Sequence, residues 1–358
     1  LSLNDNPTRA IRTLHRSDPR RPGVLLRRYD TTMPHKVEWV RRIFRAQSLD
    51  EERTLMLNAE EWPIACKVNF GPTTELGEPV ASAPAKVWRE QLAQVADLGF
   101  KYIDPMDDWV PLADLDAGRF AQFRQVLTDT HLSVAAVSIG RHSIVDVDRG
   151  RENLQTIHRT IDRAAELGAS VVDLGFMQAL TPAQRGALWF WLAEGHHDDP
   201  TLRPLAIERV RELADHAERR GIELSLEMYE DTFLGTPQDA VRFINDVDHP
   251  AVGLNPDIGN LVRLHRPMPS AREMYSQVLP YANYWHIKNY IRDEDPMTGS
   301  YMSAPAPLKY GVINYREIIR MAIRLGFRGA FMTEQYGGDW LGVGAENADY
   351  IRQVIRSA

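Results

Sequence analysis

The sequence predicts an α/β fold, a closed (β/α)8 barrel, and three observations predict it. From about residue 64, short runs rich in β-branched and aromatic residues alternate with longer stretches of helical periodicity. Eight such units can be counted. Glycine separates a helical stretch from the next strand at Gly99, Gly168, Gly221 and Gly326, where it suits a left-handed helix end. We therefore expect one barrel over residues 61–358, preceded by an N-terminal extension of residues 1–60.

The expected strands can be placed in chain order. They are residues 64–70, 101–106, 133–139, 170–176, 222–229, 251–259, 284–290 and 329–336. A doubly wound open sheet would also alternate strands with helices, but it normally has a glycine-rich phosphate loop after its first strand. The segment NFGPTTELG does not match such a loop. Eight units therefore favour the closed barrel.

Composition narrows the possible partners. The 358 residues carry a net charge of −7, which argues against nucleic acid as a ligand, and no run of 18 apolar residues suggests a membrane span. Residues 1–60 hold twelve Lys/Arg against eight Asp/Glu, so this basic extension could wrap the barrel, contact a partner or simply be solvated. Cys66 is the one cysteine, in the apolar run IACKV. A reducing cytoplasm is therefore the expected location.

Reactive residues gather where a barrel of this kind carries its chemistry, at the C-terminal ends of the strands. Glu227, Asp257, His286 and Glu334 come from the fifth to eighth expected strands. One acidic residue alone would more often be a helix cap or half of an ion pair, but four donors in apolar surroundings favour a divalent cation. Mn²⁺ is expected, with Mg²⁺ or Co²⁺ as alternatives.

Strand alternation brings two further residues to the same faces. Asn255 shares a face with Asp257, and Lys288 shares a face with His286. Both are therefore predicted to contact a substrate.

Five segments resemble the xylose-isomerase-like sugar isomerase/epimerase superfamily over roughly residues 64–355: LEMYED, GLNPDIGN, WHIKN, KYGVINYREII and MTEQYGG. The resemblance implies a xylose-isomerase-like TIM barrel with one metal ion on Glu227, Asp257, His286 and Glu334. It also implies that Glu227 and Glu334 transfer protons. Asn260 departs from the pattern, because many members have a histidine there, and it is predicted to bind substrate.

The third expected strand ends in SIGRHS, which places Arg141 and His142 at the rim. His142 is the predicted proton carrier, since an imidazole titrates near neutrality. Arg141 and Asp107 are predicted to bind substrate. Long loops follow the fourth and seventh strands and carry residues that could stack on a flat aromatic ligand, cover a partner or pack locally. These residues are Trp189, Phe190, Trp191, Tyr301 and Met302.

More loosely, the chain is similar to the large subunits of bacterial C-glycoside deglycosidases, which pair with a small second subunit and act on 3-oxo-C-glycosides. That similarity implies a metal-dependent lyase that cleaves a carbon–carbon bond after proton abstraction beside a sugar carbonyl. The alternative is a ketose epimerase or an aldose–ketose isomerase. A scaffold whose metal only stabilises the fold is a third possibility, which the full set of four metal-binding residues disfavours.

Overall fold

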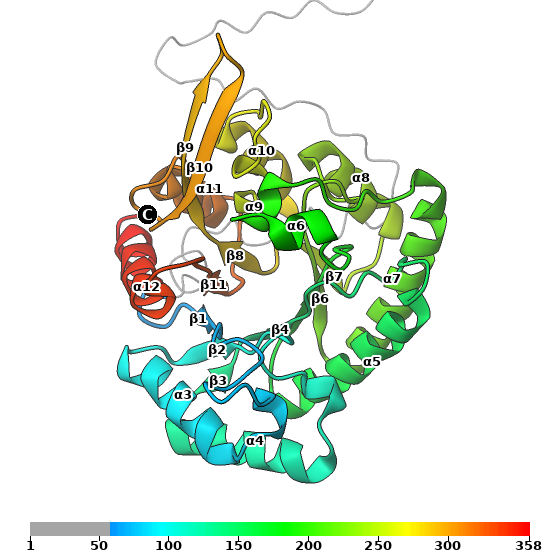
Figure 1. Ribbon diagram of the computed structural model, residues 1–358, viewed down its shortest axis with the longest axis vertical. Helices are drawn as coiled ribbons and strands as arrows, with labels where there is room; N and C mark the ends of the chain where they lie inside the picture. The colour runs from blue at the N-terminus through cyan, green and yellow to red at the C-terminus, as the bar shows by residue number, and fades with distance from the viewer. Residues whose placement is uncertain (1–57) are drawn as a thin grey trace, which may run out of the picture. The chain divides into compact units, whose positions relative to one another are not determined.

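The computed structural model describes residues 58–358, and within them the strands form a parallel barrel (Figure 1). Every expected strand is present in the predicted order. Most are shorter than predicted, because their last residues turn into rim loops. The third strand is divided into β3 and β4. The barrel strands are β1 (Ile64–Lys67), β2 (Tyr102–Asp104), β3 (Ser133–Val134), β4 (Ala136–Ser138), β5 (Val171–Leu174), β6 (Glu223–Glu227), β7 (Val252–Asn255), β8 (Trp285–Ile287) and β11 (Phe331–Thr333).

The strands pair in two parallel arcs, ordered β3-β2-β1-β11-β8 and β4-β5-β6-β7. Ala135 joins the arcs on one side, because its N–H donates to Ile103 and its carbonyl accepts from Ser170. On the other side the backbone of Asn283 donates to Leu254. There the side chain of Asn255 also accepts from the backbone N–H of His286 at 2.8 Å. The ring is therefore completed between β7 and β8 partly by a side chain.

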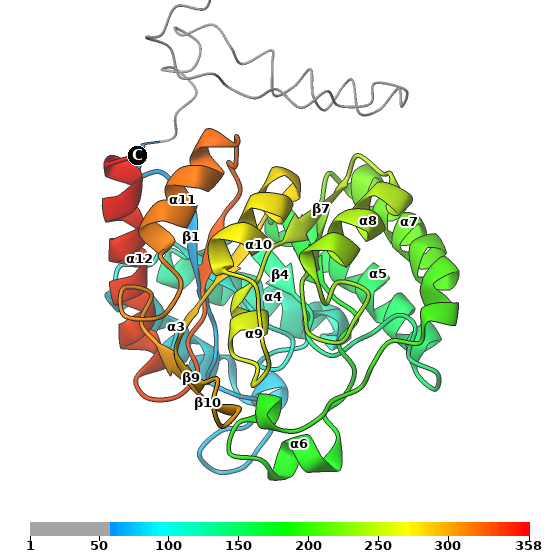
Figure 2. The same cartoon turned by 90° about the horizontal axis from the view of Figure 1, so that it is seen from above.

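Helices cover the outside of the barrel (Figures 1 and 2). Two of them end as predicted on left-handed glycines, Gly168 and Gly221, at φ 74° and 71°. The longer helices are α3 (Ala85–Asp97), α4 (Ala117–Thr130), α5 (Gly150–Leu167), α7 (Arg203–Arg220), α8 (Pro237–Val247), α10 (Ala271–Val278), α11 (Tyr315–Arg324) and α12 (Trp340–Arg356). Short helices α6 (Pro182–Gly186) and α9 (Gly259–Val262) lie in the rim segments after β5 and β7.

The segment after β8 is a hairpin, so the expectation of a long loop there was wrong. β9 (Asn289–Asp295) pairs antiparallel with β10 (Ser300–Ala306), and Gly299 completes the turn at φ 69°. The hairpin projects from the barrel in Figure 1. The far ends of both strands are mostly exposed, so they lack the apolar signal by which a barrel strand is recognised.

The main core lies between the strands and the helices, where Trp88, Phe123, Phe243 and Trp285 are fully buried. A smaller apolar cluster includes Ala65, Ala136, Val171, Tyr284 and Met332. The predicted extension of residues 1–60 lies almost entirely outside the described residues and stays a prediction. None of the described helices is both long and apolar enough to cross a membrane.

Candidate active site

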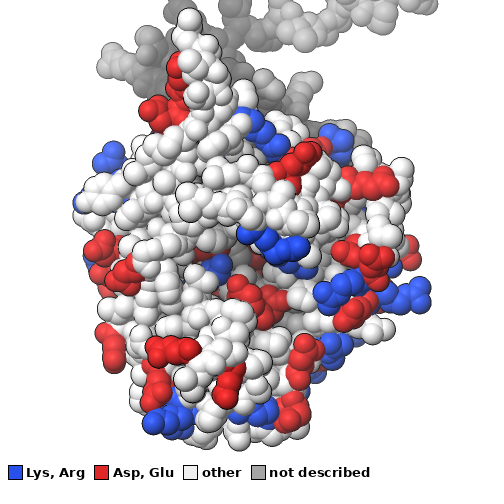
Figure 3. Space-filling view, viewed as in Figure 1, with Lys and Arg blue, Asp and Glu red and all other residues white. Residues whose placement is uncertain are grey.

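The four predicted metal-binding residues lie at the same end of the barrel. Glu227 ends β6, Asp257 follows β7, His286 lies within β8 and Glu334 follows β11. All four are buried, with 8%, 0%, 1% and 4% of their surface exposed. Figure 3 shows acidic and basic side chains around a hollow over the middle of this face. Buried charges in such a place need partners, because an unpaired charge is costly away from water.

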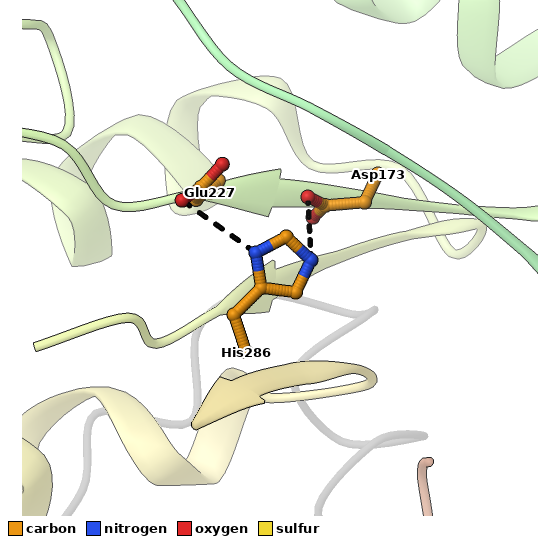
Figure 4. Close-up of side chains that lie close together, drawn as sticks. All are labelled: Asp173, Glu227 and His286. Atoms are coloured by element: carbon orange, nitrogen blue, oxygen red, sulfur yellow. Dashed lines mark ion pairs between the residues drawn. The ribbon is translucent and has the colours of Figure 1, made fainter. Parts of the chain in front are cut away.

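Metal-binding atoms come together here in two groups that share His286. In the first, atoms of Asp257, His286 and Glu334 all lie within 4.8 Å of one another. In the second, atoms of Asp173, Glu227 and His286 do so. Figure 4 shows the imidazole between two carboxylates, with Nδ1 3.6 Å from Glu227 Oε1 and Nε2 3.3 Å from Asp173 Oδ2. We call Asp173, Glu227 and His286 the histidine cluster.

The acidic residues of the other group are paired with lysines, and we call Asp257, Glu334, Lys67 and Lys288 the lysine cluster. Lys288 Nζ lies 2.6 Å from Asp257 Oδ2 and also contacts Glu334, and Lys67 Nζ lies 2.8 Å from Glu334 Oε1. Burial opposes the charge of Glu334, but the two ammonium groups outweigh it and hold its pKa well below the usual range. This carboxylate is therefore ionised.

The neighbours of Asp257 stabilise its carboxylate charge less than those of Glu334 do. Burial raises the pKa of its carboxyl despite the nearby Lys288 ammonium. The Lys288 ammonium accounts for Oδ2, but among the described residues no hydrogen-bond donor is directed at the buried Oδ1. Gly259 leaves room for the Lys288 side chain, because a Cβ there would lie 2.6 Å from Lys288 Cγ. A cation on Asp257 would satisfy the oxygen that the described residues leave without a partner, so the residues present fit a metal ion.

In the histidine cluster the imidazole balances the carboxylates. Burial lowers the pKa of His286, but Asp173 and Glu227 outweigh it and raise that pKa to about 10. Burial likewise opposes ionisation of Glu227, yet His286 brings its pKa to about 2. Burial raises the pKa of Asp173 well above its usual value. His286 is therefore cationic here, and binding a metal would require it to lose that proton.

A polar layer beneath His286 was missed from the sequence. Asp104 accepts hydrogen bonds from Ser138 Oγ at 2.5 Å and from Tyr284 at 2.6 Å, and Ser138 Oγ lies 3.1 Å from His286 Nε2. Lys67 and Asp173 were also missed. Each of these charged residues lies in a short apolar strand, the same signal that identified Asp257.

Two predicted substrate contacts are used inside the protein. Asn255 accepts from the backbone of His286 and donates to Asp173 at 3.3 Å, so both ends of its amide make hydrogen bonds within the barrel wall, and its predicted contact with a substrate stays a prediction. Asn260 donates to Glu227 Oε1 and to the carbonyl of Met228, both at 2.9 Å. Asn260 therefore orients the Glu227 carboxylate.

The rim residues bond mainly with one another and with neighbouring loops. His142 Nδ1 lies 2.9 Å from Asp107 Oδ2, and this hydrogen bond raises the pKa of His142. Arg141, at φ 54°, donates to the carbonyl of Gln178 and to the Tyr229 hydroxyl. These partners lie outside both clusters. The predicted roles of His142, Arg141 and Asp107 toward a substrate stay predictions.

The aromatic residues after β5 pack on the rim. Trp189 and Trp191 stack with their ring centroids 4.9 Å apart, and Trp191 meets Tyr290 and Tyr336 edge to face. The buried guanidinium of Arg263 lies 5.1 Å from the Trp191 ring. Of the three alternatives open from the sequence, local packing describes Trp191.

Comparisons with known proteins agree with this fold. The family model described as "Xylose isomerase-like TIM barrel" matches residues 92–357. A xylose isomerase-like TIM barrel protein from Mycobacterium smegmatis, solved in complex with magnesium, is 61% identical, with a TM-score of 0.82 over 84% of this chain and 99% of that one. No match was found among curated proteins.

More distant structures share the fold. D-allulose 3-epimerase from Methylomonas sp. is 14% identical, with a TM-score of 0.59 over 82% of this chain and 98% of that one. 3-Keto-D-glucoside 4-epimerase from E. coli is 15% identical, with a TM-score of 0.57 over 82% of this chain and 99% of that one. At these low sequence identities, the structural similarity shows only that the proteins share the barrel fold.

Proposed function

Because the chain belongs to the xylose isomerase-like TIM barrel family, we propose that it is a divalent-metal-dependent sugar enzyme, a ketose epimerase or an aldose–ketose isomerase. One observation carries the proposal: the carboxylates of Glu227, Asp257 and Glu334 lie around the imidazole of His286 at the C-terminal end of the barrel strands. The distant epimerases are the reason for choosing this reaction. The choice is a proposal because a shared fold alone does not determine the reaction.

A hard divalent cation suits three carboxylates and one imidazole. Magnesium is favoured by the 61% identical relative, which was solved with that ion, and manganese is an equally suitable candidate. When bound, the cation would polarise a substrate oxygen and lower the cost of the negative charge that proton removal creates. It would compete with Lys288 for the oxygens of Asp257 and Glu334.

The two glutamates are suited to move the proton. Both are ionised, with pKa values held low by His286 for Glu227 and by the lysines for Glu334. One carboxylate would take the proton from the carbon beside the carbonyl, and the C–H electrons would form the double bond of an enediolate. Return of a proton to the opposite face of that carbon inverts it, whereas return to the neighbouring carbon isomerises the sugar. Asn260 cannot carry a proton, but it holds Glu227 in place.

The C-glycoside lyase predicted from the sequence has no support among these comparisons. It stays a weaker proposal because the same proton abstraction beside a 3-oxo group would precede loss of the aglycone. A small second subunit belongs to that proposal only.

The test is product analysis with free ketoses, 3-oxo-O-glucosides and a 3-oxo-C-glucoside in D2O, with Mg²⁺ or Mn²⁺ and with chelator. The proposal predicts deuterium at the carbon beside the carbonyl together with an epimer or isomer, and it predicts loss of both with chelator. Release of a free phenol from the C-glucoside would favour the lyase. Turnover that persists without metal would contradict the proposed mechanism.

A further inference from the structure

Two histidines outside the candidate active site face each other between neighbouring helices. His158 lies on α5 and His216 on α7, and their Nδ1 atoms are 2.8 Å apart. The ring centroids are 5.0 Å apart. Both side chains are partly exposed, at 27% and 17%.

Each imidazole is held at its other nitrogen by a carboxylate of the opposite helix. His158 Nε2 lies 3.0 Å from Glu212 on α7, and His216 Nε2 lies 3.2 Å from Asp162 on α5. Each helix therefore supplies one histidine and one acid four residues apart, on one face. Arg220 also pairs with Asp162 and helps to fix it in place.

This arrangement determines where the protons lie. An ionised carboxylate only accepts hydrogen bonds, so both Nε2 atoms carry hydrogen. In neutral rings both Nδ1 atoms would then present lone pairs to each other at 2.8 Å. That contact is repulsive unless a cation lies between them. A shared proton is one such cation, and a metal ion is the other.

We propose that His158 and His216 form a second metal site, which takes one borderline transition-metal ion such as Ni²⁺, Cu²⁺ or Zn²⁺ through both Nδ1 atoms. A carboxylate on the far nitrogen is the arrangement that orients histidine ligands of metals and raises their basicity. With metal–nitrogen bonds of 2.0–2.1 Å, the two nitrogens lie about 2.9 Å apart at the 90° angle that Ni²⁺ and Cu²⁺ prefer, and about 3.3 Å apart around tetrahedral Zn²⁺. The rings must therefore separate by at most roughly half an ångström. Water would complete the coordination.

The site would link the α5 and α7 helices. It has imidazole ligands only, whereas the candidate active site has mostly carboxylates, so the two sites differ in metal preference. This inference does not depend on the proposed sugar chemistry.

The test is a Ni²⁺ titration of the full chain by calorimetry in excess Mg²⁺, comparing wild type with His158→Gln and His216→Gln. His131→Asn is the matched control, because His131 is exposed, has no histidine beside it in the chain, and lies at φ 56°, a conformation that asparagine tolerates. The proposal predicts about one Ni²⁺ fewer in each pair variant and no loss in the control. It also predicts that Ni²⁺ raises the Tm of wild type more than that of the pair variants.

Equal Ni²⁺ stoichiometry and equal Tm shifts in wild type and both pair variants would overturn the proposal, leaving a shared proton between the rings. An equal loss in His131→Asn would also overturn it, since binding would then be adventitious. Thermal melts without metal verify that every variant is folded.

Discussion

The two clusters that meet at the candidate active site balance their charges in different ways. In the lysine cluster, Asp257 and Glu334 face the ammonium groups of Lys67 and Lys288. In the histidine cluster, Glu227 faces an imidazolium, and burial favours the neutral form of Asp173. Each cluster is therefore close to neutral before any metal arrives. A divalent cation would leave excess positive charge, which must be relieved by moving Lys288 or by removing the His286 proton.

The two clusters therefore have different roles. The lysine cluster keeps the Glu334 carboxylate ionised in the metal-free protein, so it preserves a negative ligand for a cation. The histidine cluster fixes one ring nitrogen through Asp173 and leaves Nδ1 toward Glu227. Substitutions that separate these tasks test the comparison.

The largest effect is expected from the two proton-transferring glutamates. Glu227→Gln and Glu334→Gln should each lower kcat about 10³-fold, because positioned acid–base groups contribute on that order. Turnover and deuterium exchange on the preferred ketose measure this. Glu194→Gln, at an exposed rim position, is the control and should keep full activity. A variant of either glutamate that retained more than half of the activity would show that its cluster does not transfer protons.

The next effect concerns Asp173. Asp173→Asn should weaken metal binding by about 10-fold or more, because the carboxylate beside His286 Nε2 orients the ring and supports its basicity. Calorimetric titration with Mn²⁺ measures the affinity. Asp114→Asn on the outer surface should leave it unchanged. Unchanged affinity in Asp173→Asn would remove Asp173 from the site.

Lys288→Met should strengthen metal binding, whereas Asp173→Asn weakens it. Removing the competing ammonium should tighten Mn²⁺ binding on the order of 10-fold, while the metal-free variant should melt lower because Asp257 loses its charged partner. Calorimetry and thermal melts on the same samples measure both effects. Weaker metal binding in this variant would mean that Lys288 supports the cation instead of competing with it.

The smallest effect is expected from Asp198, a half-buried carboxylate outside both clusters. Asp198 accepts a hydrogen bond from the backbone of Phe233 at 2.8 Å, and burial raises its pKa to about 7. The folded state thus binds more protons than the unfolded state between about pH 4 and 7, so Asp198 contributes stability at low pH that is lost as pH rises through 7. From about pH 5 to 8, wild type should lose on the order of 5 °C in Tm relative to Asp198→Asn. Parallel pH profiles would contradict this assignment.

Much of this site could be predicted from the sequence because a charged residue is conspicuous in an apolar strand. That signal, together with the resemblance, identified Glu227, Asp257, His286 and Glu334. The same signal was present for Lys67 and Asp173, which lie in strands where no metal-binding residue was expected.

The pairing of residues could not be predicted, because it depends on distances across the barrel. Strand alternation predicted that Lys288 shares a face with His286, but it did not reveal that Lys288 pairs with Asp257. It also did not show that the side chain of Asn255 accepts a hydrogen bond from the backbone of His286 within the barrel wall. The β9–β10 hairpin was missed because both its strands extend beyond the apolar core.

The central claim is that the two clusters together hold one divalent cation. Its most direct test is elemental analysis of the purified chain and of Asp257→Asn after dialysis against Mn²⁺. About one ion per chain in wild type, absent from a variant that remains folded, is the predicted result. No bound ion in wild type, or the same amount in both proteins, would contradict the claim and leave the buried charges as a purely internal network.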